Sequence, residues 1–193
     1  MKIVNYILLN SKGGYFNSRL ENTMEASGLD DLYTKLGIDY PKFYKMDSLS
    51  QLGFLLAEGL TEDAMNKVGA ILVWNKHSSF DADKKHTENV AAGISGPANF
   101  TYTLPNIVVG EIAIRHKING ETGIFITLSP DFKQIAQTTK AYLNSFSTGG
   151  VWIGWLDARE GILQGFMCYV VQDTANIDIF AADLENIYAK LIV

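Results

Sequence analysis

One serine lies where a nucleophile could act. Ser129 follows the apolar run 122–128 and precedes Pro130 and Asp131, at which an amphipathic helix is expected to begin. The positive end of a helix dipole favours negative charge on a group placed there. A serine hydroxyl still needs an adjacent base to become a nucleophile, and the sequence shows no base for Ser129. Alternatively, Ser129 is only the N-cap of a helix whose first residue is Pro130, an interpretation that explains it fully.

The cysteine and one of the histidines offer weaker candidates. Cys168 lies inside an expected strand, between Met167 and Tyr169, which predicts a buried and inert thiol. His116 lies between two cationic residues near the end of an expected helix. We interpret it as a surface cation beside the negative end of that helix.

Residues 75–96 hold two histidines and two aspartates. This stretch is polar and contains glycine, which predicts a loop with at most one helical turn. The spacing of the four side chains matches no closed metal site, so a solvated loop is favoured over metal binding, and no metal or cofactor is expected. The four residues are His77, Asp81, Asp83 and His86.

The composition is that of a globular protein without a nucleic-acid partner. Its 193 residues are enough for a sizeable core, and we expect a single domain over 1–193. The net charge is −5, and no basic run with interleaved aromatic residues suggests nucleic-acid binding. A single cysteine excludes an internal disulfide and favours a reducing compartment. We recognise no signal peptide and no membrane span, so we expect a cytoplasmic protein.

Five apolar segments predict the strands of an α/β fold. Residues 68–74 have the continuous apolar character of a central strand that is covered on both faces. Residues 15–40 mix charges, glycines and short apolar clusters, and they predict one or two short helices within a long excursion. Apolar residues at helical spacing predict helices over 48–60 and 105–118, from 130 onward and over 180–191. The strands are expected at 3–9, 68–74, 122–128, 151–156 and 162–171.

The order of these elements resembles the centre of the β-ketoacyl synthases, the condensing enzymes of fatty-acid and polyketide synthesis. The resemblance rests on the helix 105–118, the turn at Asn119-Gly120, the strand 122–128 and the turn 129–132, and further likeness covers 43–47, 68–73, 78–83 and 149–158. In that family the strand delivers a nucleophilic cysteine to the start of a buried helix, and the alignment puts Ser129 in its place. The resemblance implies an α/β fold that is the N-terminal half of a thiolase-like fold, with a five-stranded mixed sheet flanked by helices.

The resemblance also implies incomplete condensation machinery. The family's catalytic histidine pair comes from its second half, whereas the histidines here all precede Ser129. No catalytic residue is therefore expected, and Ser129 marks a degenerate nucleophile position. In the family, the neighbourhood of His77 and Ser79 lies near the mouth of the active site, which leaves a supporting role open to either residue.

Non-catalytic relatives called chain-length factors suggest the function. They keep the fold, lack the cysteine and pair with an active synthase, and the strand before the nucleophile forms the dimer contact. The resemblance thus implies a subunit of a fatty-acid or polyketide ketosynthase, with aryl-polyene and flexirubin pathways as candidates. The net negative charge of this chain disfavours direct attraction to an acidic acyl carrier protein, so recruitment through the partner is favoured. The corresponding interface residues here are Gly123, Ile124, Phe125, Ile126, Thr127 and Leu128.

Two alternatives stay open. The first is an acyltransferase or hydrolase that uses Ser129 on an acyl thioester. The second is a homodimer that binds an acyl chain or a carrier protein without chemistry.

Overall fold

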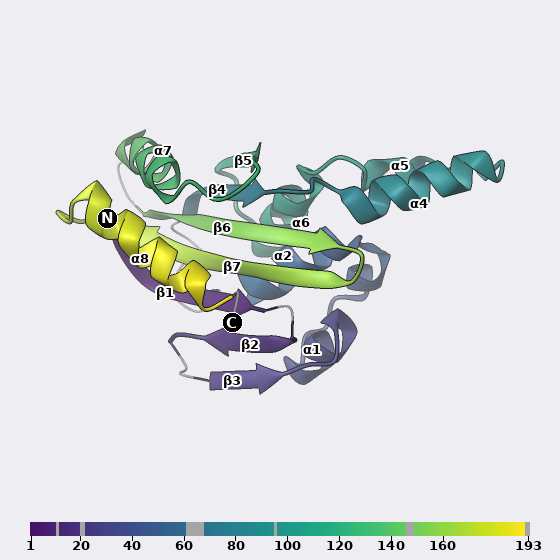
Figure 1. Cartoon of the computed structure of the whole chain (residues 1–193), viewed down its shortest axis with the longest axis horizontal. Helices are drawn as coiled ribbons and strands as arrows, with labels where there is room; N and C mark the ends of the chain where they lie inside the picture. Colours follow the sequence, from purple (N-terminus) through teal and green to yellow (C-terminus); the bar gives the residue numbers. More distant parts are fainter. Residues whose placement is uncertain (11, 20–21, 61–67, 95, 146–148, 192–193) are drawn as a thin grey trace.

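A mixed sheet lies between two layers of helices (Figure 1). The computed structural model describes residues 1–10, 12–19, 22–60, 68–94, 96–145 and 149–191. Within these ranges seven strands form the sheet in the order β3-β2-β1-β7-β6-β4-β5. The strands are β1 (Lys2–Leu9), β2 (Gly14–Asn17), β3 (Asn22–Glu25), β4 (Val68–Asn75), β5 (Glu121–Ile126), β6 (Gly150–Arg159) and β7 (Ile162–Val171). The helices are α1 (Leu29–Lys35), η1 (Pro41–Lys45), α2 (Ser48–Glu58), α4 (Phe80–Ala91), α5 (Pro97–Thr101), α6 (Ile107–His116), α7 (Phe132–Ser145) and α8 (Ile177–Ala189).

Strand direction determines where loops gather. Strand β4 pairs in parallel with both β5 and β6, whereas β7 runs antiparallel to its neighbours β6 and β1. The carboxyl ends of β4, β5 and β6 therefore meet at one end of the sheet. The segments that follow these three strands are brought together there, although they lie far apart in the sequence.

Each face of the sheet buries a separate apolar cluster. Helices α1, α2 and α6 pack on one face, and α7 and α8 pack on the other. Strand β6 shows why both layers are needed, because its side chains alternate between them: Trp152 and Leu156 enter the first cluster, and Ile153 and Trp155 enter the second. Across the described part of the chain, none of the helices combines the length and apolarity needed to cross a bilayer.

The sheet exceeds the predicted five strands by a hairpin. All five expected strands form. The extra strands β2 (from Gly14) and β3 fall almost entirely within residues 15–40, where only one or two short helices were predicted. One such helix, α1, does form there. Each of the two strands has four residues, too few to show the alternation by which a strand is recognised. Gly13 takes the left-handed backbone (φ 83°) at the turn into β2. Residues 20 and 21 of this segment lie outside the described ranges.

The predicted loop over 75–96 was wrong, because most of it is the helix α4. Its sequence is polar, and Ala82 is its one buried residue. A helix with so little buried surface has no apolar stripe to reveal its period. In Figure 1, α4 and the short helix α5 extend away from the sheet as an arm.

Candidate functional site

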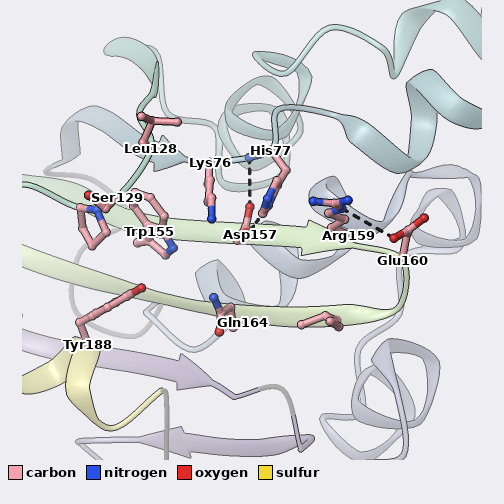
Figure 2. A pocket seen from close by; sticks show the side chains of 12 residues that line it. Lys76, His77, Leu128, Ser129, Trp155, Asp157, Arg159, Glu160, Gln164 and Tyr188 are labelled. Carbon is pink, nitrogen blue, oxygen red and sulfur yellow. Dashed lines mark hydrogen bonds and ion pairs between the residues drawn. The ribbon is translucent and has the colours of Figure 1, made fainter.

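A cavity of about 490 Å³ opens where β4, β5 and β6 end (Figure 2). Ligands bind at the carboxyl ends of parallel strands in open α/β sheets, so this position is itself informative. The lining residues come directly after β4 and β5, from the end of β6, from β7 and from α8. They are Lys76, His77, Leu128, Ser129, Pro130, Trp155, Asp157, Arg159, Glu160, Ile162, Gln164 and Tyr188.

Ser129 lines this cavity but does not cap the following helix. Asp131 is the cap instead: its Oδ1 accepts a hydrogen bond from Gln134 N (2.9 Å), and its backbone O accepts one from Ile135 N (2.9 Å). The predicted N-cap role of Ser129 was therefore wrong, because the carboxylate of Asp131, two residues later and directly before the helix, satisfies its first amides. The Ser129 side chain is exposed, and no described residue hydrogen-bonds to it.

His77 and Asp157 form the best-defined polar contact in the cavity. The Nδ1 atom of His77 lies 2.8 Å from Oδ2 of Asp157, and the backbone N of His77 donates to Oδ1 at 3.2 Å. The carboxylate is buried, so it holds both the ring and the chain of His77. With Nδ1 donating to Asp157, the Nε2 atom of a neutral ring carries the free lone pair.

Two neighbours fix the turn that carries His77. The Nδ2 of the fully buried Asn75 donates to Leu156 O on β6 (2.7 Å), and Ser78 N donates to Asn75 Oδ1. Ser78 adopts a left-handed backbone with φ 54°. The turn from β4 into α4 is thus attached to β6 through Asn75 and through the His77–Asp157 pair.

The two ends of the cavity differ in polarity. Figure 2 shows Leu128, Trp155 and Tyr188 at one end, with His77 and Arg159 at the other. Burial, and secondarily the charge of Asp157, raises the pKa of Tyr188, so its hydroxyl remains a neutral donor. The site is therefore amphipathic.

Of the other candidates in the predicted loop, Asp81 and His86 have structural contacts, whereas Asp83 is exposed on α4. Asp81 accepts hydrogen bonds from Ser48 Oγ (2.9 Å) and from Glu160 N (2.8 Å), which links α4 to α2 and to the β6–β7 turn. His86 contacts the edge of Phe100. Within the described ranges, no group of three or more His, Cys, Asp or Glu side chains could hold a metal ion.

His116 is not the predicted surface cation. It is 4% exposed and packs edge-on against Trp152, with ring centroids 5.2 Å apart. Burial lowers its pKa to about 4, so the ring is neutral near pH 7. The prediction that Cys168 is a buried thiol is confirmed, and its complete burial raises its pKa further above the physiological range.

Strand β5 forms one edge of the sheet. It pairs with β4 on one side, and no described strand pairs with its other side. Gly123, Ile124 and Phe125 are half-buried, whereas Ile126 is 50% exposed and Leu128, just past the strand, is 87% exposed. The strand predicted to form an interface is therefore an open edge with apolar side chains at its carboxyl end.

Sequence reasoning missed several residues of the cavity. Asp157, Lys76, Arg159 and Tyr188 received no role. Lys76 directly follows β4, while Asp157 and Arg159 lie near the end of β6. Polar residues at the ends of predicted parallel strands were a usable signal for these three, whereas nothing local marked Tyr188 on α8.

A mixed sheet between two layers of helices is the fold of the thiolase-like condensing enzymes and of chain-length factors, and this chain has that fold. It is similar to a chain of "Ketosynthase (ApeO) in Complex with its Chain Length Factor (ApeC) from Xenorhabdus doucetiae", with a TM-score of 0.67 and 12% sequence identity, over 89% of this chain and 79% of that one. It is also similar to a chain of "The ishigamide ketosynthase/chain length factor", with a TM-score of 0.66 and 12% identity, over 90% of this chain and 62% of that one.

The predicted resemblance is thus confirmed for the fold. No protein-family model matches the sequence, and comparison with curated proteins gives no match either.

Proposed function

We propose that this chain is a non-catalytic, chain-length-factor-like subunit that pairs with an active β-ketoacyl synthase in fatty-acid or polyketide biosynthesis. The observation that carries the proposal is the open, apolar edge of β5 in a fold shared with ketosynthase and chain-length-factor chains. Acyl carrier protein would then reach the complex through the synthase.

The chemistry of the described residues supports a role without condensation. A condensing enzyme needs a thiolate to hold the first acyl group and donors to stabilise an enolate. Ser129 stands where the resemblance puts the cysteine, and Cys168 is buried inside the sheet. The subunit would therefore contribute shape and an interface.

The backbone of β5 is suited to strand pairing. Thr127 N donates to Asn75 O on β4 (2.9 Å), and amide directions alternate along a strand. The amides of Ile124 and Ile126 therefore point to the open edge. A partner strand would satisfy these amides and would cover the side chains of Ile126 and Leu128, removing the hazard of an exposed edge.

A proline placed on this edge tests the pairing. Ile126→Pro removes an outward amide while leaving the bonds to β4 in place, because proline is tolerated on edge strands. We expect affinity-tagged wild-type chain to co-purify with the synthase of the same gene neighbourhood, and Ile126→Pro to lose at least nine tenths of it.

The opposite edge provides a matched control. Thr23 on β3 also directs its amide away from its neighbour, because Ala26 N donates to Gly13 O and directions alternate. Thr23→Pro should leave the co-purification unchanged. Equal retention of the synthase by wild type and Ile126→Pro would overturn the proposed interface, and a native mass of twice the chain with no synthase bound would favour a homodimer.

A further inference from the structure

We propose that the cavity at the ends of β4, β5 and β6 is a hydrolytic site for short-chain acyl esters and thioesters, in which His77 is the general base and Asp157 orients it. This activity needs no condensation machinery and no partner, and the proposed subunit is non-catalytic only with respect to condensation. The activity is therefore independent of the proposed pairing function.

The pair has the arrangement that general-base catalysis requires. A carboxylate bound to Nδ1 fixes the ring and the tautomer, so that Nε2 can accept a proton. Asp157 does this with a 2.8 Å contact to the ring and a second contact to the backbone of His77. The His77 side chain keeps 22% of its surface exposed, which leaves it accessible from the cavity.

The lining indicates the class of substrate. An apolar end beside a polar end suits an acyl chain whose carbonyl lies near the base. Figure 2 shows Trp155 and Leu128 on one side of Lys76 and His77 on the other. Lys76 is exposed and has no described ion-pair partner, so its ammonium group can stabilise an oxyanion.

The attacking group is water, since Ser129 has no hydrogen bond to His77 within the described structure. His77 Nε2 takes a proton from water as the water oxygen bonds to the acyl carbon. The carbonyl electrons move onto oxygen beside Lys76. The tetrahedral intermediate then collapses, the bond to the thiol sulfur or alcohol oxygen breaks, and the imidazolium returns the proton to that leaving group. The products are one carboxylic acid and one thiol or alcohol.

The test follows hydrolysis of p-nitrophenyl butyrate and of butyryl-N-acetylcysteamine by the purified chain between pH 5 and 9. The His77→Asn variant removes the base but keeps an N–H that can donate to Asp157, so the turn is preserved. We expect kcat/KM to fall about 100-fold in this variant. Asp157→Asn should lower kcat about 10-fold with KM nearly unchanged, because an amide no longer fixes the tautomer and orientation of the His77 ring.

Two further variants keep the outcome decisive. His86→Asn changes a histidine of α4, the helix that follows the His77 turn, outside the cavity, and should stay within twofold of wild type. Lys76→Met should lower kcat about 10-fold with an unchanged urea midpoint, so it reports on the site even if a His77 variant misfolds.

Hydrolysis by wild type no faster than by free imidazole at the same concentration would overturn the proposal. Full activity of His77→Asn would show that the pair only fixes the turn. Neither result would bear on strand pairing, which is measured with the β5 variants.

Discussion

Two histidine–carboxylate pairs in this protein use the same residue types for different purposes. In the cavity, His77 Nδ1 lies 2.8 Å from Asp157 Oδ2. Between α6 and α2, His116 Nε2 lies 3.3 Å from Glu58 Oε1, and the His116 side chain is only 3% exposed. In the first pair the carboxylate also binds the backbone amide of the same histidine.

In the second pair the carboxylate of Glu58 hydrogen-bonds to Arg115 and not to the histidine. Arg115 donates to both oxygens of Glu58, at 2.8 and 3.0 Å, and its guanidinium lies over the rings of Tyr40 and Phe54. The Nε2 atom of His116 makes no hydrogen bond in the described structure. His116 shows that a nearby carboxylate does not by itself raise the pKa of a histidine, because burial lowers it while Glu58 hydrogen-bonds to Arg115.

The largest contrast between the pairs should appear when each carboxylate is neutralised. Glu58→Gln leaves the guanidinium of Arg115 without its charged partner, which should lower the free energy of unfolding by about 3 kcal/mol, the low end for buried pairs because Arg115 is partly exposed. Asp157→Asn should cost roughly 1 kcal/mol, since the amide oxygen still accepts from the chain of His77. Urea unfolding at pH 7 measures both. Equal losses would show that the two pairs play the same structural role.

The second contrast is the dependence of stability on pH. The pKa of His116 is about 4 in the folded chain, because burial opposes the charged ring, whereas a histidine in an unfolded chain has its ordinary pKa of 6.5. Between these values the unfolded chain binds more protons, so stability is complete above pH 6.5 and falls as pH decreases toward 4. From pH 7 to pH 5 the free energy of unfolding should fall by about 2 kcal/mol from this residue.

Comparison with a variant isolates this contribution. His116 faces Glu58 and Arg115. The hydrogen bonds to Glu58 raise the pKa of Arg115, so the guanidinium stays charged from pH 7 to pH 5. His116→Leu should lose the decrease of about 2 kcal/mol, whereas His77→Asn should keep it. A pH slope that survives in His116→Leu would show that another group is responsible.

The buried position of His116 could have been predicted from the sequence, and its neighbours in the chain explain why a surface position was predicted instead. Its cationic flanks suggested a surface position, yet Ile112 and Val109 lie four and seven residues earlier on the same helical face and are buried. The period of the helix outweighs the character of adjacent residues. The five longer strands were predictable for a similar reason, because their apolar runs extend over several residues, whereas the four-residue strands β2 and β3 offered no such pattern.

The site was predictable only in part. The family resemblance placed Ser129 just after the strand that became β5 and left a supporting role open to His77 or Ser79. The partner of His77 lies 80 residues away, so only knowledge that β4 and β6 are adjacent could identify Asp157. The contact between His77 and Asp157 was harder still to predict because the polar sequence of α4, which follows His77, resembles that of a loop.

The smallest expected effect concerns the stability contributed by His77. His77→Ala removes the ring contact but retains the backbone donor to Asp157, and the turn stays attached through Asn75. We therefore expect a loss of about 1 kcal/mol in urea unfolding at pH 7, typical of one hydrogen bond. His116→Ala should lose more, about 3 kcal/mol, because it opens a cavity against Trp152. A loss at His77 as large as that at His116 would mean that the His77–Asp157 pair serves stability. A preserved fold with lost hydrolysis would mean that the pair serves catalysis.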